Sequence, residues 1–339
     1  MAEPAHAART APSDAERAPL DAADFPGCRA VRITPEQIDE YEGRLEYWER
    51  RTGTAMVVCE PTTTYHERPG HRLAGLAALI AASRGSAIAA FGTSDLVRFD
   101  ARGKPRVLMQ ADQILYLHPP SAEELAPKVD VDGGALPDVV LEVDYSTDVR
   151  VRKLRLYEAW GFPEVWVDVP DVGSPSRPKA RVPGLAIHVL EGGRFVRAEC
   201  SRAFPGWTAE EIHRALNEHR MSDITREALH HVGAALSSAE GTGPDDDPWL
   251  RHYRNEGRAE VRYESVLAIL EERGITAAPS LPARLAALGV LPANAMVRAA
   301  LRCASESEFL ALCAAERGCR PSIERRAPPA TKPAPAPRR

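Results

Sequence analysis

The clearest pattern of apolar and polar positions lies between residues 136 and 171 and predicts a strand, a helix and a second strand. β-Branched apolar residues dominate positions 138–144, apolar residues recur at helical spacing over 148–160, and a second apolar run covers 164–169. Side chains alternate between the two faces of a strand, so Val139, Leu141 and Val143 share one face and Val140 lies on the other. The opposite face carries three carboxylates, those of Asp138, Glu142 and Asp144.

Three carboxylates on a strand with a buried pattern need a physical reason, because an isolated buried carboxylate is costly unless it is paired, protonated or bound to a metal. The following helix brings positive charge close to this face, from Arg150, Arg152, Lys153 and Arg155. Carboxylates beside a lysine suit a divalent-metal site for phosphodiester hydrolysis, where the metal activates water and the lysine stabilises developing charge. A structural interpretation stays open, because Pro-Asp before a strand is often a turn and a strand glutamate is often ion-paired.

The same residues resemble a known family. The segments PDVVLEV, at 137–143, and KLRLYEAWGFPEVWVDVPD, at 153–171, resemble the core of the Uma2 family, also called DUF820. This is a family of restriction endonucleases in the PD-(D/E)XK nuclease superfamily, and the resemblance extends more weakly over about residues 46–216. It implies a mixed α/β fold of the restriction-endonuclease type, with a central mixed sheet flanked by helices. It also implies cleavage of DNA that depends on Mg²⁺, or on Mn²⁺ in its place.

The resemblance assigns metal binding to Asp112 and Glu142. Asp112, in MQADQILYL, matches a metal-binding aspartate at the end of a strand, although Ala111 and Gln113 depart from the usual neighbours. Residues on adjacent strands lie about 5 Å apart, closer than the roughly 6.7 Å between alternate residues of one strand. Asp112 with Glu142 is therefore a better metal clamp than Glu142 with Asp144.

The resemblance implies roles for further residues. In the KLxLY match, Lys153 positions water or stabilises the pentavalent charge, and Tyr157 shares its helix face four residues on. Asp138 is expected as an auxiliary acid, and His66 matches a loop histidine that precedes an apolar helix, here 70–83. Two departures weaken the match: the link from the strand to the helix is short, and Thr54 stands where family members often carry a glutamate.

Elsewhere the pattern predicts an amphipathic helix over residues 36–50 and a helix that opens at Thr208 with a capping box to Glu211. Strands are expected over residues 55–59, 86–91, 96–99, 106–117, 185–190 and 195–199, the last two as a hairpin.

Changes in composition divide the chain into four parts. Residues 1–33 form an expected disordered leader, 34–217 the nuclease-like domain, 218–320 a helical region, and 321–339 a disordered, basic, proline-rich tail. The helical region is expected to hold a long helix over 249–273 and shorter ones within 279–315. Their apolar stripes are expected to pack against one another or against a second subunit, as in a homodimer.

Charge and cysteine content restrict the setting of the protein. The net charge of −5 gives no global attraction to nucleic acid, so any DNA contact needs a local basic patch. The six cysteines lack a CxxC pair or zinc-like spacing, which fits a reduced, cytoplasmic setting. The longest apolar run, 73–82, is too short to cross a bilayer, so we expect a soluble protein with no membrane partner.

The leading interpretation is a Mg²⁺-dependent DNA endonuclease, with Asp112 and Glu142 as the metal ligands and DNA as the partner. One alternative is a catalytically silent nuclease-fold module that binds nucleic acid or supports assembly. A third is a structural oligomeriser built on the C-terminal helices. DNA specificity is not encoded in any recognisable base-reading module.

Overall fold

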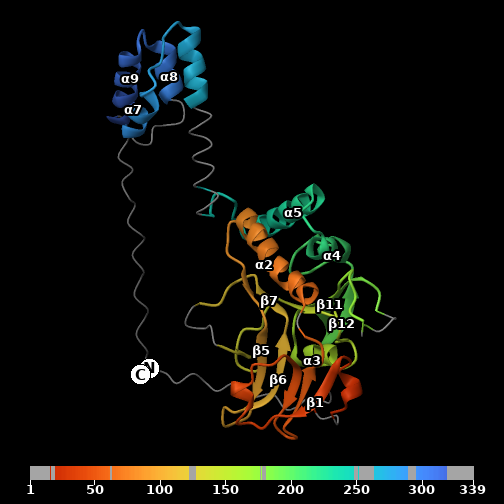
Figure 1. The fold of residues 1–339 in the computed structure, drawn as a ribbon. Helices are drawn as coiled ribbons and strands as arrows, with labels where there is room; N and C mark the ends of the chain where they lie inside the picture. Colours follow the sequence, from red (N-terminus) through yellow and green to blue (C-terminus); the bar gives the residue numbers. More distant parts are fainter. Residues whose placement is uncertain are drawn as a thin grey trace, which may run out of the picture. The chain divides into compact units, whose positions relative to one another are not determined.

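The computed structural model describes residues 16, 20–61, 63–121, 127–175, 177, 181–247, 251, 263–288 and 295–318. They divide into two compact units, residues 1–251 and residues 252–339. The first unit has a mixed α/β fold, in which helices flank two six-stranded sheets (Figure 1). The expected α/β class and the mixed-sheet architecture flanked by helices are confirmed, and the strands form two sheets instead of one.

The first sheet is built from strands of the N-terminal part of the chain. In spatial order these are β1 (Cys28–Arg32), β3 (Thr54–Val58), β2 (Leu45–Glu49), β6 (Pro105–Ala111), β5 (Ser94–Phe99) and β8 (Val129–Asp130). Neighbouring strands are antiparallel except β5 and β8, which are parallel. Gly53 ends the turn between β2 and β3 with φ +61°, a left-handed conformation that favours glycine.

The second sheet contains the predicted strand–helix–strand stretch. In spatial order its strands are β12 (Arg194–Ala198), β11 (Gly184–Glu191), β10 (Glu164–Val169), β9 (Val139–Val143), β7 (Gln113–Tyr116) and β4 (Ala89–Phe91). Strands β9 and β10 are parallel and are joined through helix α3 (Lys153–Trp160), whereas the other pairs are antiparallel. The expected strands over 138–144 and 164–169 and the helix between them are confirmed.

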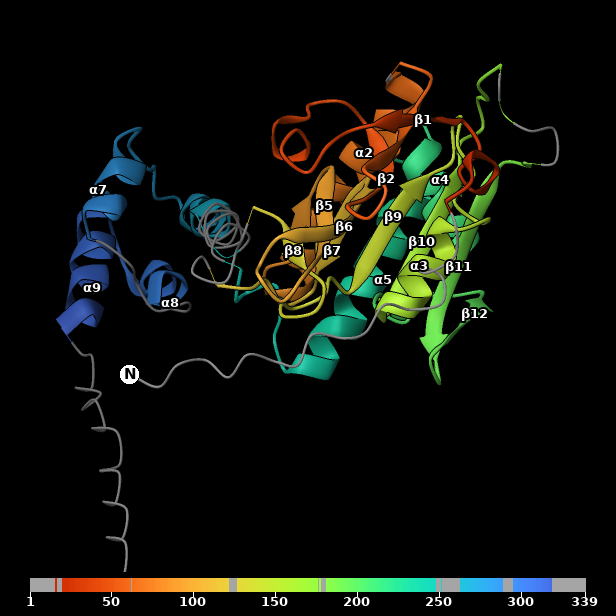
Figure 2. The same cartoon turned by 90° about the horizontal axis from the view of Figure 1, so that it is seen from below.

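Strand β9 lies in the middle of the core and is buried on both faces. Val139, Leu141 and Val143 pack with helices α2 (Thr64–Arg84), α4 (Ala209–Asn217) and α5 (Asp223–Glu240). Val140, on the opposite face, packs with Tyr157 of α3 and with residues of the first sheet. The second sheet therefore lies between the helices α2, α4 and α5 on one side and α3 with the first sheet on the other (Figure 2).

Two expected elements near the N-terminal half are wrong. Residues 36–50 do not form one helix: a short 3₁₀ helix, η2 (Ile38–Glu40), is followed by strand β2. All five residues of β2 are buried, because β3 and β6 flank the strand. The apolar residues that suggest one face of an amphipathic helix therefore belong to a strand that is buried along its whole length. The expected single strand over 106–117 is broken at Asp112 into β6 and β7, which belong to different sheets.

Helix α2 begins earlier than expected. Thr63 caps it by accepting a hydrogen bond from the His66 amide, so His66 lies in the first turn of the helix and not in a loop. The predicted capping box at Thr208 is confirmed, since its hydroxyl accepts from the Glu211 amide and the Glu211 carboxylate accepts from the Thr208 amide.

The boundaries of the first unit differ from the expected 34–217. The 3₁₀ helix η1 (Ala22–Asp24) and strand β1 lie in the expected leader, and β1 pairs with β3. Beyond residue 217, Leu229 and Val232 of α5 share a core with Ile80 of α2. The expected boundary at residue 34 rests on composition, which identifies polar sequence but does not reveal that β1 pairs with a distant strand. Much of the leader and the tail 321–339 lie outside the described residues.

The second unit is helical, as expected for most of 218–320. Its helices are residues 263–272, α7 (Leu281–Ala287), α8 (Ala295–Arg302) and α9 (Glu306–Gly318), and they share a core that includes Leu270, Leu281 and Phe309. The expected long helix over 249–273 is described only at residue 251 and over 263–272. No helix in the described ranges combines the length and hydropathy that a bilayer-spanning segment needs.

Candidate functional site

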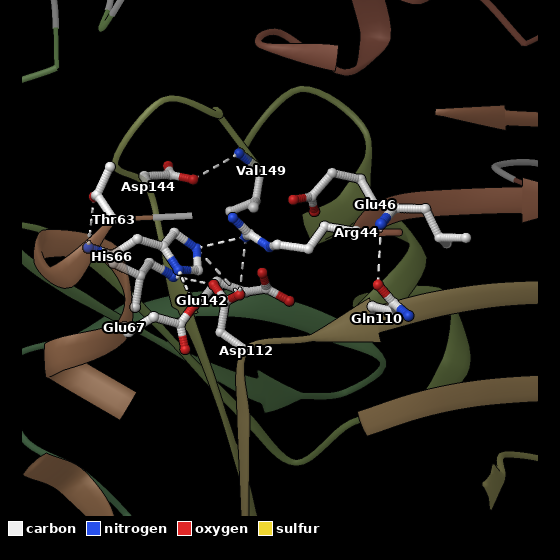
Figure 3. A network of polar contacts seen from close by, with 12 residues as sticks. Arg44, Glu46, Thr63, His66, Glu67, Gln110, Asp112, Glu142, Asp144 and Val149 are labelled. Atoms are coloured by element: carbon white, nitrogen blue, oxygen red, sulfur yellow. Dashed lines mark hydrogen bonds and ion pairs between the residues drawn. The ribbon is translucent and has the colours of Figure 1, made fainter. Parts of the chain in front are cut away.

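The two predicted metal ligands come from neighbouring strands. Asp112 is the single residue between β6 and β7, at the point where the chain passes from one sheet to the other. Gln113 lies opposite Leu141 in the β7–β9 register, which brings Asp112 beside Glu142. The Val143 amide donates to Asp112 Oδ2 at 2.8 Å and fixes this carboxylate against β9. Figure 3 shows the Asp112 side chain close to those of Glu142 and His66.

Helix α3 provides the partners of Glu142. Lys153 and Tyr157 lie four residues apart on one helix face: Lys153 Nζ donates to Glu142 Oε2 at 2.8 Å, and the Tyr157 hydroxyl donates to Glu142 Oε1. The Glu142 and Lys153 side chains are only 1% and 2% exposed. Burial raises the pKa of Glu142, although Lys153 opposes this. Burial lowers the pKa of Lys153, but Glu142 and Glu46 outweigh it, so Lys153 stays a cation.

Three residues of the first sheet, Arg44, Glu46 and Gln110, join the site and were not predicted. Lys153 Nζ donates to the Glu46 carboxylate at 2.5 Å and to the Gln110 carbonyl at 2.6 Å, while the Gln110 side chain accepts from the Leu45 amide. The predicted helix over residues 36–50 hides Arg44 and Glu46, and the strand pattern over 106–117 does not mark the Gln110 carbonyl as a partner of Lys153. The Arg-Arg-Thr-Gly turn between two apolar runs is the hairpin signal that would have placed Glu46 on a strand.

His66 reaches the site from the first turn of α2. Its Nε2 lies 2.7 Å from an Arg44 guanidinium nitrogen and 3.3 Å from Asp112 Oδ1, and its Nδ1 lies 3.1 Å from Glu67 Oε1. Burial lowers the pKa of His66, but Asp112 raises it by more. The contact with Arg44 points the other way, because a guanidinium only donates.

Asp112 connects the buried site to solvent. Burial would raise the pKa of Asp112, but His66, Lys153 and Arg44 outweigh it and hold this pKa far below its usual value. The Asp112 side chain is 16% exposed and lines a pocket of about 280 Å³, together with His66. A substrate that enters this pocket therefore meets Asp112 before Glu142.

Asp138 does not lie in the site, contrary to expectation. It precedes β9, and its Oδ2 accepts from the Leu117 amide at 2.7 Å. Asp138 and Glu142 are four residues apart, which is about 13 Å along an extended strand. Alternation puts two side chains on one face but does not bring them together, so Asp138 stabilises the end of the β7–β9 pairing.

Asp144, beyond the other end of β9, has partners of its own. Its Oδ1 accepts from the Val149 amide at 3.1 Å, and Arg181 pairs with Oδ2. Burial raises the pKa of Asp144 to about 7, although Arg181 opposes this. Asp144 thus closes the loop between β9 and α3. The predicted residues that the structure does bring together are Asp112, Glu142, Lys153, Tyr157 and His66.

The donors in this site suit Mg²⁺. Among the described residues, no three histidine, cysteine, aspartate or glutamate side chains are close enough to share a metal. Mg²⁺ nevertheless binds proteins commonly through one or two carboxylates, with water and phosphate oxygens as its other ligands. Asp112 and Glu142 are such a pair, and each carboxylate oxygen that accepts from Val143, Lys153 or Tyr157 keeps a second lone pair.

Comparisons with known proteins give a distant likeness. No family model and no curated protein matches the chain. Among solved structures, it is similar to "a putative nuclease belonging to DUF820" from Anabaena variabilis ATCC 29413. The two are 11% identical with a TM-score of 0.35, and the match covers 59% of this chain and 99% of the other. This likeness is too distant to assign a function to the site.

Proposed function

We propose that this protein is a hydrolase that cleaves phosphodiester bonds of DNA internally, with Mg²⁺ or Mn²⁺ held by Asp112 and Glu142. The observation that supports this most is the convergence of Asp112, Glu142 and Lys153 from three separate elements at one buried point. That point opens to a pocket through Asp112. Carboxylates and a fixed cation are the groups that phosphoryl-transfer chemistry needs.

The residues of the chain divide the work among them. The bound metal would activate a water and neutralise charge on the scissile phosphate. Lys153, oriented by Glu46 and Glu142, supplies fixed positive charge beside the pentavalent transition state. Tyr157 sets the orientation of the Glu142 carboxylate. Arg44, 24% exposed, is the cation available to a phosphate oxygen at the mouth of the site.

The test is nicking of supercoiled plasmid with Mg²⁺ or Mn²⁺. Glu142→Gln and Lys153→Met are each expected to reduce the rate about 100-fold or more, as for lost electrostatic stabilisation. Asp138→Asn is the matched control, because an asparagine oxygen can still accept from the Leu117 amide. It is expected to cut like the wild type. Cutting that survives in both site variants would overturn the proposal.

A second candidate is a silent nuclease-fold module that binds nucleic acid or supports assembly. The observation that favours it is that both Glu142 oxygens already accept hydrogen bonds from Lys153 and Tyr157. This candidate predicts DNA binding by the folded wild type that is indifferent to Mg²⁺ and to Glu142→Gln, with no nicking of any substrate. Binding that requires both the metal and Glu142 would exclude it.

A further inference from the structure

The pocket beside Asp112 is lined by a glutamine whose side-chain amide has no hydrogen-bond partner among the described residues. Gln113, the first residue of β7, is only 4% exposed and lines the pocket. Within the part of the chain that the structure describes, its side chain makes no hydrogen bond. Neither amide atom of Gln113 is among the fully buried, unpaired side-chain atoms of the described residues, so its donor and acceptor face the open space of the pocket.

Two glycines keep the space in front of this amide free. A Cβ at Gly70 of α2 would lie 3.4 Å from Gln113 Oε1, and one at Gly92, just after β4, would lie 4.0 Å from it. Larger side chains at either position would fill the pocket between α2 and the β4–β7 edge of the sheet. The open volume of about 280 Å³ is at the small end of ligand pockets.

The lining of the pocket disfavours anionic ligands. Glu67 and Asp112 both border it, so a bare phosphate would meet like charge. Ala74 of α2 and Ala90 of β4 add apolar contact to the lining. A small, neutral, flat molecule with a hydrogen-bonding edge matches this lining best.

We propose that the pocket receives one unpaired nucleobase of the substrate, next to the scissile phosphate, and that Gln113 hydrogen-bonds the edge of that base. A glutamine amide offers a donor and an acceptor side by side, the arrangement with which glutamine reads base edges. For the class of substrate this rests on the function proposed above. A base reaches such a pocket only from a single strand or after extrusion from a duplex.

The direct test uses ligand-observed NMR to measure binding of each of the four 2′-deoxynucleosides to the full chain without metal. Deoxyribose 5-phosphate is the probe for sugar-phosphate binding alone. At least one nucleoside is expected to bind and the sugar phosphate is not. Gln113→Met, of similar size but apolar, is expected to weaken nucleoside binding about ten-fold and to remove any preference among the bases.

A pair of glycine variants controls for the shape of the pocket. Gly70→Leu fills the space before Gln113 and is expected to abolish nucleoside binding. Gly75 lies on the same helix, and nothing lies within 4 Å of a Cβ added there. The Gly75→Leu variant is therefore expected to bind nucleosides like the wild type. Binding unaffected by Gln113→Met, or no binding by folded wild type, would overturn the subsite.

Failure of the subsite is distinguishable from failure of the hydrolase. Nucleoside binding requires neither metal nor cleavage, whereas plasmid nicking reports Glu142 and Lys153. Nicking with no nucleoside binding would refute only the subsite. Nucleoside binding with no nicking would support the pocket and count against hydrolysis. If nicking and nucleoside binding both occur, the cleavage rates of single-stranded and duplex DNA are compared. The comparison shows whether the base enters from a single strand or after extrusion from a duplex.

Discussion

Two buried carboxylates on neighbouring strands, Glu142 of β9 and Asp168 of β10, have contrasting surroundings. In the parallel register Glu142 lies opposite Val167, so Asp168 points to the other side of the sheet. There the carboxylate accepts from His213 Nδ1 at 2.7 Å and from the Asn217 amide, both on α4. Glu142 instead faces α3 and the first sheet.

The contrast lies in charge balance. Around Glu142, the carboxylates of Glu46 and Asp112 add to its own, and the permanent cations that face them are Lys153 and Arg44. Asp168 instead has the donors of His213 and Asn217 as partners and lies on the face of the sheet away from Glu142. The first arrangement leaves negative charge that a cation can neutralise, whereas the second is satisfied by its own hydrogen bonds. We therefore expect the first to serve activity and the second to serve stability.

The largest expected effect is on the free energy of unfolding of Lys153→Met. Removal of this buried cation leaves Glu46 and Glu142 unpaired, which costs about 3–5 kcal/mol in metal-free buffer. Urea unfolding followed by tryptophan fluorescence measures it in the first unit, which contains all five tryptophans. A double variant with Glu46→Gln should cost less than the sum of the single changes. Additive costs would contradict the shared-charge interpretation.

The second largest expected effect is the loss of stability in Asp168→Ala, which tests whether Asp168 serves stability without serving activity. Loss of the acceptor leaves His213 and Asn217 without their buried partner, at a cost of about 2–3 kcal/mol. Plasmid nicking per folded molecule should stay at the wild-type level, because this carboxylate lies on the far side of the sheet. Asp168→Asn, which keeps one acceptor oxygen, should cost less. A folded Asp168 variant that no longer nicks DNA would break the comparison.

The parts of the site that are local in sequence could be predicted, and those that depend on distant pairing could not. The two-residue period of β9 and the helical period of α3 place Glu142, Lys153 and Tyr157 in elements that meet. Asp112 came from a family resemblance, since no period marks a residue between two strands of different sheets. The period of β9 also misled, because it gives Asp138 the same face as Glu142 without giving the distance.

Arg44 and Glu46 show the other limit. Glu46 lies on β2 and Arg44 immediately precedes this strand, which is buried because β3 and β6 lie on either side of it; those partners are distant or ambiguous in the sequence. Apolar residues at helical spacing in a short segment cannot be distinguished from a buried strand by period alone. The same reasoning covers the fold: individual strands are visible in the pattern, whereas their division into two sheets at Asp112 depends on tertiary pairing.

Mg²⁺ provides a test that applies to only one of the two carboxylates. A ligand that binds only the folded state stabilises it, by about 1.4 kcal/mol at ten times its dissociation constant. This shift is expected in wild type and in Asp168→Asn, and it should be absent when Asp112→Asn and Glu142→Gln are combined. Urea unfolding with and without Mg²⁺ measures it. A shift that persists in the combined variant would place the metal elsewhere.

The smallest expected effect is a pH dependence at His213. Burial lowers the pKa of His213, but Asp168 and Asp171 outweigh it, so the folded pKa lies above the unfolded value near 6.5. A raised pKa contributes stability that is complete below the unfolded value and is lost as the pH rises through the folded one. His213→Gln should therefore cost about 1 kcal/mol at pH 6 and less at pH 9.

His188 supplies the matched control for that measurement. Burial, helped by Arg197 on the neighbouring strand, lowers the pKa of His188. Its contribution to stability therefore has the opposite sign: it is present above the unfolded pKa and is lost as the pH falls through the folded one. Urea unfolding across pH 6–9 measures the free energy of unfolding of each variant relative to wild type. Toward low pH this relative stability should rise for His188→Gln and fall for His213→Gln. Parallel trends in the two variants would show that the Asp168 pair does not determine the pH dependence.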